Sequence, residues 1–181
     1  MSPRALARLL LIATASGLVG CGYTLANAPD ASLAPFTVRA AAANTPDATA
    51  LTAAVEGAQR ELSRAGLLSA RGDGTLLTIA VVRVDERSEG IAAGAAPSGS
   101  ASATPHARGI RVTIVGRATA PASASAPSRD SGEIEVGEIY ASSGSATHGI
   151  LGRDEAARRA GRRLGERLVR RLLGEIDPGE P

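Results

Sequence analysis

The stretch Leu76-Leu77-Thr78-Ile79-Ala80-Val81-Val82-Arg83-Val84 decides the fold of this chain. Its branched apolar residues suit a pleated surface, and the nearly continuous apolar run predicts a strand in the middle of a sheet. Two more strands follow it in the sequence. Gly109–Ala118 alternates apolar and polar residues, and so does Glu133–Ala141. These three segments predict the main part of one sheet.

The last of these strands carries two further signals. Glu133 and Glu135 alternate with Ile134, which predicts that the two glutamates line the solvent side of the strand. The alternation then slips near Gly137, because Ile139 falls in the polar phase. A slip of this kind predicts a β-bulge at Gly137.

Upstream of the central strand, the chain predicts a short strand and a helix. Phe36-Thr37-Val38-Arg39 alternates with period two, as a strand does. Thr45-Pro46-Asp47 is typical of a helix start, with Thr45 or Asp47 as the cap. Gly66 ends this helix. Its apolar face repeats at helical spacing: Leu51, Val55, Ala58 and Leu62.

A second helix is predicted over Asp154–Leu173. Asp154 and Glu155 are placed in its first turn, where the helix dipole favours negative charge, and Gly174 terminates it. Its apolar stripe is formed by Ala157, Gly161, Leu164, Leu168, Val169 and Leu172.

The order strand, helix, three strands, helix predicts an α+β fold. Strands joined by hairpins pair antiparallel, and amphipathic helices bury their stripes on one sheet face. We therefore expect a two-layer sandwich with a mainly antiparallel four-stranded sheet and two helices packed on one face. Two stretches rich in Gly, Ala, Ser and Pro, 88–108 and 121–131, are predicted to be long disordered connections.

The N-terminus is typical of an exported, lipid-anchored protein. Arg4 and Arg8 precede a short apolar run that ends in Leu18-Val19-Gly20-Cys21, a pattern similar to a bacterial lipobox. The run is too short to span a bilayer. We expect a signal peptide over 1–20 and lipidation of Cys21. The rest divides into a tether (21–35), one domain (36–174) and a disordered tail (175–181).

The composition excludes several classes of function. Cleavage before Cys21 would leave 161 of the 181 residues, enough for one domain. It would also remove two of the 20 basic residues, all of which are arginine, and leave 18 against 18 acidic ones. This balance argues against nucleic-acid binding by global charge. A single cysteine allows no intramolecular disulfide.

No catalytic, metal or cofactor site is expected. The two histidines, His106 and His148, lie in small-residue segments without a nearby acidic or cysteine partner. A Ser-His pair of Ser143 or Ser145 with His148 stays open, although no nucleophile elbow accompanies it. The glutamates at 133, 135 and 138 could suggest a cation site, yet Glu133 and Glu135 more simply define the solvent-facing side of a strand. Arg71-Gly72-Asp73-Gly74 predicts a turn.

Cys21-Gly22-Tyr23 at the lipidation site, Asn44-Thr45 before the first helix, and the order of elements resemble the LPS-assembly lipoprotein E (LptE) family. That resemblance covers nearly the whole mature chain. It implies a non-enzymatic outer-membrane lipoprotein that faces the periplasm. It also implies a partner β-barrel translocon (LptD-like), whose lumen the protein plugs while lipopolysaccharide (LPS) is delivered to the outer leaflet. The two small-residue loops and the scarcity of aromatic residues depart from the family pattern.

Four arginines are candidate contacts for LPS or another anion: Arg111 and Arg117 on the middle strand, and Arg159 and Arg163 on the C-terminal helix. Arginine pairs with phosphates and carboxylates in a bidentate manner. An ordinary solvated face is the simpler explanation of these arginines. Two other function classes remain open, a lipoprotein that activates a peptidoglycan synthase or scaffolds a secretion complex, and a periplasmic hydrolase. Sorting to the inner or the outer membrane is also open. Glycine rather than aspartate at position 22 implies the outer membrane under the enterobacterial sorting rule, but that rule depends on the organism.

Overall fold

The computed structural model describes residues 33–42, 45–89, 108–122, 127–142 and 146–174. All of them belong to one compact unit, Ser32–Pro181. Several sequence predictions fall outside the described residues: the signal peptide, lipidation of Cys21, His106, Ser143, Ser145, most of the tether, most of the 88–108 connection and the C-terminal tail.

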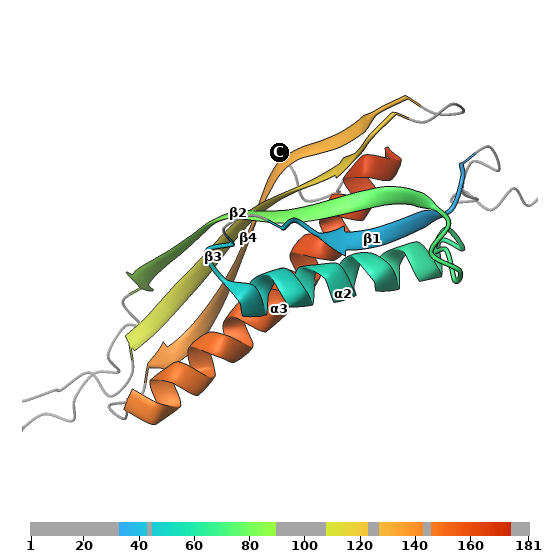
Figure 1. Ribbon diagram of the computed structural model, residues 1–181. Helices are drawn as coiled ribbons and strands as arrows, with labels where there is room; N and C mark the ends of the chain where they lie inside the picture. The colour runs from blue at the N-terminus through green and yellow to red at the C-terminus, as the bar shows by residue number, and fades with distance from the viewer. Residues whose placement is uncertain (1–32, 43–44, 90–107, 123–126, 143–145, 175–181) are drawn as a thin grey trace, which may run out of the picture. The chain divides into compact units, whose positions relative to one another are not determined.

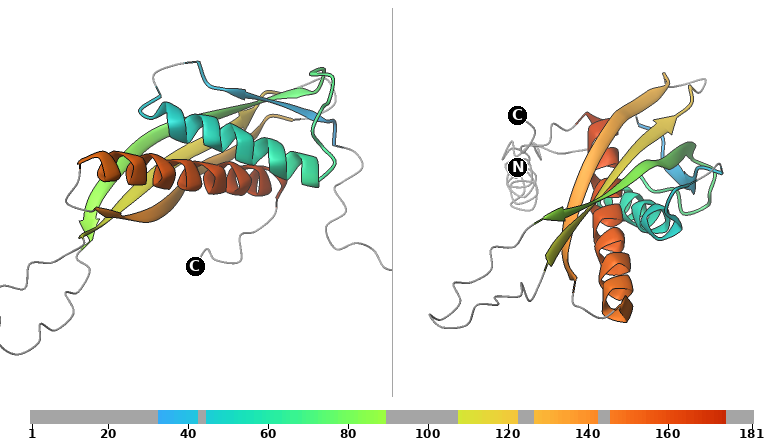
Figure 2. Two further views of the ribbon diagram at one scale, coloured as in Figure 1. Left: turned by 90° about the horizontal axis from the view of Figure 1, so that it is seen from below. Right: turned by 90° about the vertical axis from the view of Figure 1, so that its left-hand side faces the viewer.

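The fold is α+β, as the sequence predicted. The described residues form a four-stranded sheet and two helices (Figure 1), and in Figure 2 both helices lie on the same face of the sheet. The described elements are β1 (Phe36–Ala40), α2 (Ala48–Arg64), β2 (Thr75–Glu89), β3 (Arg108–Ala120), β4 (Arg129–Ser142) and α3 (Ala146–Leu173).

The sheet has the strand order β1-β2-β3-β4. β2 pairs antiparallel with β3, and β3 pairs antiparallel with β4, so the sheet is mainly antiparallel. β1 pairs parallel with β2, from Phe36 opposite Thr75 to Ala40 opposite Ile79. This parallel pair arises because α2 carries the chain back along the sheet before β2 begins, which is the usual route between parallel neighbours.

The predicted bulge at Gly137 is wrong. Gly137 lies in regular register opposite Thr113, and Ile139 is simply an exposed apolar residue on the outer side of β4. The register shifts instead between Val81 and Arg83 and between Arg117 and Thr119. The sequence suggested a bulge because an apolar residue at a solvent-facing position, such as the isoleucine at 139, gives the same pattern as a shift in the alternation.

The second helix begins earlier than predicted. α3 starts at Ala146, so Asp154 and Glu155 are not in its first turn, where the structure has no acidic residue. The early turns run beside the end of β4. A Cβ built on Gly152 would lie 3.1 Å from Cδ2 of Tyr140. The segment is thus helical where it packs against β4, although its glycines did not predict a helix.

α2 has the predicted ends. The carboxylate of Asp47 accepts a hydrogen bond from the amide N–H of Ala50 at 2.9 Å, which makes Asp47 rather than Thr45 the side-chain cap. Gly66 follows the helix with φ of 70°, the left-handed conformation that favours glycine at a helix end.

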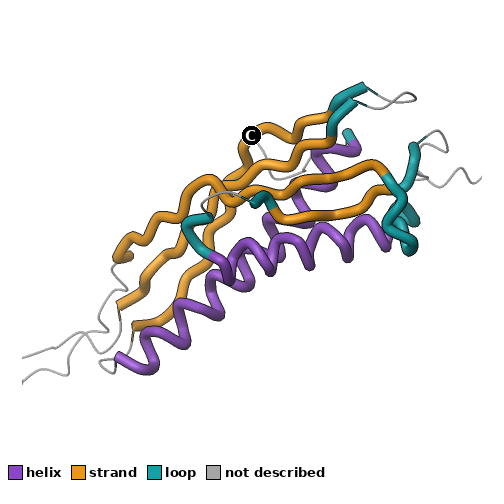
Figure 3. Tube along the Cα trace, in the orientation of Figure 1, coloured by secondary structure: helices purple, strands orange, loops and turns teal. Residues whose placement is uncertain are grey.

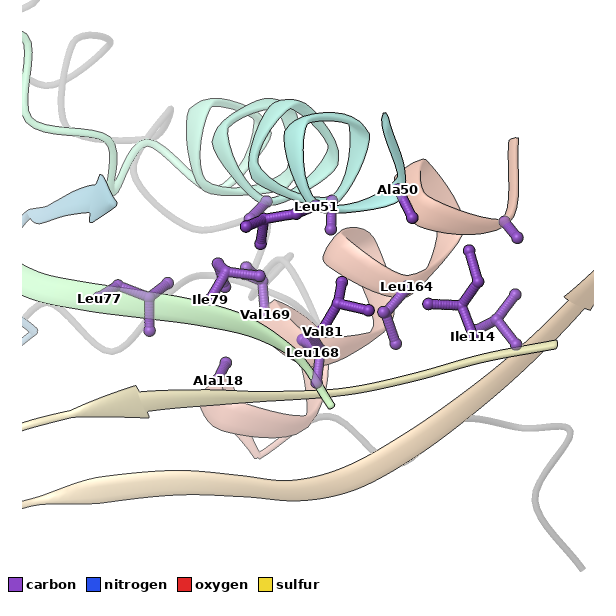
Figure 4. Packing of buried hydrophobic residues seen from close by; sticks show 14 of the residues in the cluster. Ala50, Leu51, Leu77, Ile79, Val81, Ile114, Ala118, Leu164, Leu168 and Val169 are labelled. Atoms are coloured by element: carbon purple, nitrogen blue, oxygen red, sulfur yellow. The ribbon is translucent and has the colours of Figure 1, made fainter. Parts of the chain in front are cut away.

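The hydrophobic core lies between the helices and the sheet (Figure 4). The predicted stripes of both helices face it, with Val55 only partly buried. Leu164 packs above β3 at Gly116, where a Cβ would lie 2.7 Å from Cδ2 of Leu164. The largest fully buried side chains are Leu62, Leu77, Ile79, Val112, Ile114, Leu164, Leu168 and Val169.

The two helices touch through small residues. A Cβ on Gly57 would collide with the carbonyl of Arg162, and one on Gly165 would collide with the carbonyl of Ala54. A Cβ on Gly161 would likewise collide with the carbonyl of Ala50. The helix backbones can approach this closely because these positions carry no side chain. The crossing therefore fixes how both helices lie on the sheet.

Candidate functional site

The described elements leave one face of the sheet without a covering layer. Along β3, Val112, Ile114 and Ala118 are fully buried toward the helices, so the alternate residues Arg111 and Arg117 lie on the opposite, open face. Figure 2 shows both helices on the other face of the strands. Two of the four predicted anion contacts therefore belong to this open face.

Arg111 is paired with a carboxylate on the neighbouring strand. Its guanidinium donates to both carboxylate oxygens of Glu89, with Nη2 at 3.2 Å from Oε2. The hydrogen bond from Arg111 holds the pKa of Glu89 below its usual value and raises the pKa of Arg111. Arg111 is thus committed to a pair within the face.

Arg117 forms a similar bidentate pair with Asp130 of β4. Nε of Arg117 lies 2.7 Å from Oδ1 of Asp130, and Nη2 donates to Oδ2. Asp130 also accepts a hydrogen bond from the amide N–H of Gly132 at 2.9 Å. The Arg117 guanidinium, followed by this backbone bond, lowers the pKa of Asp130 to about 2.

The open face consequently alternates in charge. Arg83 and Asp85 add a third pair at 2.7 Å, and Glu133 and Glu135 are exposed on β4, as the sequence predicted. Exposed pairs of this kind contribute little to stability, because water screens them. What they provide is a largely polar surface whose charges are mostly paired.

The other two predicted arginines, Arg159 and Arg163, lie on the helix side of the sheet and pair with the same glutamate. The sequence did not predict that this glutamate faces the helices. Both arginines pair with Glu138 of β4, Arg159 Nε at 4.0 Å, and the side chain of Glu138 is only 14% exposed. Arg159 also pairs with Glu155 at 3.5 Å. Glu138 lies two residues after buried Val136, so the period-two pattern could have placed it under α3.

The side chain of Arg163 is 63% exposed although it pairs with Glu138. Arg158, one turn earlier, is 49% exposed and bonds Glu155 at 2.9 Å. Arginines outnumber carboxylates along α3, so this helix presents the more cationic surface of the described domain. A dianionic phosphate could be met here by guanidinium groups that reach solvent.

Arg153 was not singled out from the sequence, yet it joins three elements. Its Nη1 lies 3.0 Å from Oδ2 of Asp47 at the start of α2, and its Nε lies 2.6 Å from Oε1 of Glu86 on β2. The hydrogen bond with Glu86 raises the pKa of Arg153. Burial raises the pKa of nearby Tyr140. No local sequence pattern could reveal the role of Arg153, because its two closest partners lie far away in the chain.

A groove of about 310 Å³ lies between the two helices on their outer side. Its lining offers hydroxyls and one pair of opposite charges, but no nucleophile with an adjacent base. The lining residues are Ala48, Thr49, Thr52, Ala53, Glu56 and Arg158.

The described residues do not test the predicted absence of catalytic and metal chemistry. Within the described ranges, no three His, Cys, Asp or Glu residues gather as metal ligands would. His148 is exposed in α3, and its candidate serine partners lie outside the described residues. Arg71–Gly74 belongs to the connection between α2 and β2, as predicted, with Gly72 at φ of 75°. Among the helices that the structure describes, none has the length and apolarity needed to cross a bilayer.

Comparison with known proteins gives a distant structural likeness. No family model matches the chain, and no curated protein matches it. Among solved structures, the chain is similar to a protein described as a putative lipoprotein from Caulobacter crescentus CB15. The two are 16% identical with a TM-score of 0.44, and the match covers 77% of this chain and 88% of that one.

Proposed function

We propose that the chain is a lipoprotein anchored through Cys21 to the outer membrane of a Gram-negative bacterium, and that it assists a β-barrel LPS translocon. In this role the domain occupies the barrel lumen and helps deliver LPS to the outer leaflet. The lipobox-like stretch Leu18-Val19-Gly20-Cys21 supports the anchor. Two or more acyl chains hold a protein stably on a membrane.

The observation that carries the proposal is the open face of the sheet. Arg111–Glu89, Arg117–Asp130 and Arg83–Asp85 cover it with opposite charges in pairs. The interior wall of a large outer-membrane barrel is polar, so a largely polar surface whose charges are mostly paired can lie against it with few unpaired charges buried. This face would meet the barrel, and α3 would stay accessible to the glycolipid.

Of the four predicted arginines, Arg163 is then the better candidate for LPS contact. The phosphates of a glycolipid can be met by guanidinium groups that keep solvent access, as the 63% exposed side chain of Arg163 does. Arg111 and Arg117 instead serve the open face, where their guanidinium groups are committed to Glu89 and Asp130.

A mild-detergent pull-down of the full chain from its own membrane, followed by mass spectrometry, tests the partner. A stoichiometric outer-membrane β-barrel is the expected result. Recovery of a peptidoglycan synthase or a secretion component without any barrel would overturn the proposal and favour the alternative class of lipoprotein.

One pair of variants tests the face. Thr113→Trp places a bulky side chain on the open face of β3, whereas Thr52→Trp places the same side chain on the exposed side of α2. We expect the first to abolish barrel capture and the second to preserve it, with unchanged circular dichroism in both. Equal capture by the two variants would exclude the open face as the docking surface.

The anchor is tested separately by the mass of the N-terminal peptide. An acylated peptide that begins at Cys21 is expected, together with loss of membrane attachment in Cys21→Ala.

A further inference from the structure

The domain has two ends that differ in charge. One end, the β1 end, holds β1, the start of β2, the end of β3, the start of β4 and the last turns of both helices. The helix ends belong there because two hydrogen bonds join them to the edge strands. The amide N–H of Phe36 donates to the carbonyl of Leu67, and the guanidinium of Arg129 donates to the carbonyl of Leu172. The β1 end comprises the described residues 33–40, 60–79, 117–122, 127–133 and 166–173.

The β1 end is basic. Its sequence holds nine arginines, at positions 39, 60, 64, 71, 117, 129, 167, 170 and 171, against five carboxylates, at positions 61, 73, 130, 133 and 166, a formal charge of +4. The opposite end comprises 45–47, 83–89, 108–115, 135–142 and 146–155, with five arginines against eight carboxylates, a formal charge of −3. The described residues at the two ends therefore carry opposite formal charges.

Pairing within the β1 end leaves this excess in place. Glu61 is shared by two guanidinium groups, Arg64 at 2.6 Å and Arg170 at 2.9 Å. Arg60 reaches Glu166 at 3.4 Å with a side chain that is still 53% exposed. One carboxylate that serves two arginines leaves a net positive charge at the surface.

The connection between α2 and β2, Ala65–Gly74, adds exposed apolar surface to the same end. Leu68 is 37% exposed, and Ala70 and Arg71 are exposed beside it. The carboxylate of Asp73 and the amide N–H of Gly72 both bond the hydroxyl of Ser69, which holds the turn in shape. A leucine next to an arginine in such a turn can meet an apolar–polar boundary with both groups.

This connection is bound to the point where the N-terminal segment enters the domain. The amide N–H of Phe36 donates to the carbonyl of Leu67 at 2.7 Å, and that of Ser69 donates to the carbonyl of Phe36 at 2.8 Å. The amide N–H of Thr75 donates to the carbonyl of Pro35 at 2.8 Å. Figure 3 shows this connection at the ends of β1 and β2. Only 14 residues separate Cys21 from Phe36.

We propose that the β1 end docks on an anionic phospholipid surface, with Leu68 at the level of the headgroups and Arg71 and the helix-end arginines on the phosphates. The inference rests on the proposed lipid anchor. The 14 residues between the anchor and the domain span at most about 50 Å, so the anchor would keep this end near the membrane. Each arginine near an anionic membrane surface contributes binding, and a single buried leucine adds to it. The basic and the apolar groups act together at the end that the tether keeps near the membrane.

Sedimentation with vesicles tests the docking without the anchor. All described elements and the hydrophobic cluster lie within the compact unit Ser32–Pro181, so this unit can be studied alone. We expect it to bind vesicles of phosphatidylglycerol and phosphatidylcholine in equal parts at low salt, to bind them less at high salt, and not to bind pure phosphatidylcholine. No binding to the anionic vesicles would overturn the proposal.

Two matched charge reversals locate the contact. Arg71→Glu at the β1 end should weaken binding to the anionic vesicles at least about fivefold. Arg87→Glu, an equally exposed change at the opposite end, should alter it by less than about twofold. Equal losses in both variants would show attraction by overall charge and overturn the assignment of one end.

A fluorescent probe gives a second reading. The unit Ser32–Pro181 contains no cysteine, so an environment-sensitive dye can be attached to Leu68→Cys or to Ile150→Cys at the opposite end. We expect a blue shift with anionic vesicles at position 68 only. A shift at position 150 alone would place the membrane contact at the wrong end. Failure of the barrel or anchor proposals is read separately, from the pull-down and from the mass of the Cys21 peptide.

Discussion

The helix crossing and the open face of the sheet meet their neighbours in opposite ways. At the crossing, Gly57, Gly161 and Gly165 bring two backbones so close that no Cβ fits. On the open face, Arg111 and Arg117 extend long side chains that end in half-exposed ion pairs. The crossing depends on glycines that carry no side chain, whereas the open face consists mainly of long charged side chains.

This difference indicates where the chain can change. Packed interiors respond to the addition or loss of single carbon atoms, whereas exposed ion pairs are nearly neutral for stability. The crossing and the core beneath it should therefore determine whether the domain folds. The open face and the outer arginines can vary to suit a partner without loss of the fold.

Leu164→Ala should give the largest loss. Leu164 is fully buried on the core side of α3, above Gly116. Truncation of a buried leucine costs about 2–5 kcal/mol in the free energy of unfolding, because a cavity remains. Urea denaturation of the unit Ser32–Pro181 measures this value. Arg87→Ala, on an exposed strand position, should stay within about 0.5 kcal/mol and serves as the control.

Gly165→Ala tests the crossing itself. The added Cβ would collide with the carbonyl of Ala54, so the helices must separate, and we expect a loss of about 1–3 kcal/mol. Gly149→Ala makes the same change in the same helix at a position with nothing within 4 Å. That variant should gain about 0.5–1 kcal/mol from helix propensity. Equal effects of both substitutions on urea denaturation would contradict the close packing.

Asp47→Ala removes the cap of α2 and the contact with Arg153. The lost hydrogen bond to the amide N–H of Ala50 predicts a decrease of about 1 kcal/mol in the free energy of unfolding. Asp85→Ala, which breaks only the exposed pair with Arg83, should cost less in the same measurement. A larger loss for Asp85→Ala would reverse the comparison between buried caps and surface pairs.

The smallest effect concerns the pH response of the open face. The pKa of Asp130 lies at about 2 in the folded chain, against 3.8 for the free side chain. A lowered carboxyl pKa stabilises the fold above pH 3.8, and this contribution disappears as the pH falls toward 2. In a carboxyl NMR titration of Arg117→Gln, the midpoint of Asp130 should move up toward 3.8. An unchanged midpoint would show that Arg117 is not the cause.

Several features followed from the sequence because their causes are local. Asp47 caps α2, Gly66 ends it, and the apolar stripes predicted both buried helix faces. The alternation of Ile134 with Glu133 and Glu135 gave the correct sides of β4. In each of these places, the residues that decide the structure lie within one or two turns of the element they shape.

The tertiary structure decided the rest. The parallel pairing of β1 with β2, the early start of α3 and the regular register at Gly137 depend on neighbours that are distant in the sequence. Two partners of Arg153, Asp47 and Glu86, lie 106 and 67 positions away along the chain. Such contacts carry no local pattern, because any arginine can reach many carboxylates and only the packed helices and sheet select among them. The sequence by itself thus determined the elements and their buried faces, and packing determined the charge pairs and the charge difference between the two ends.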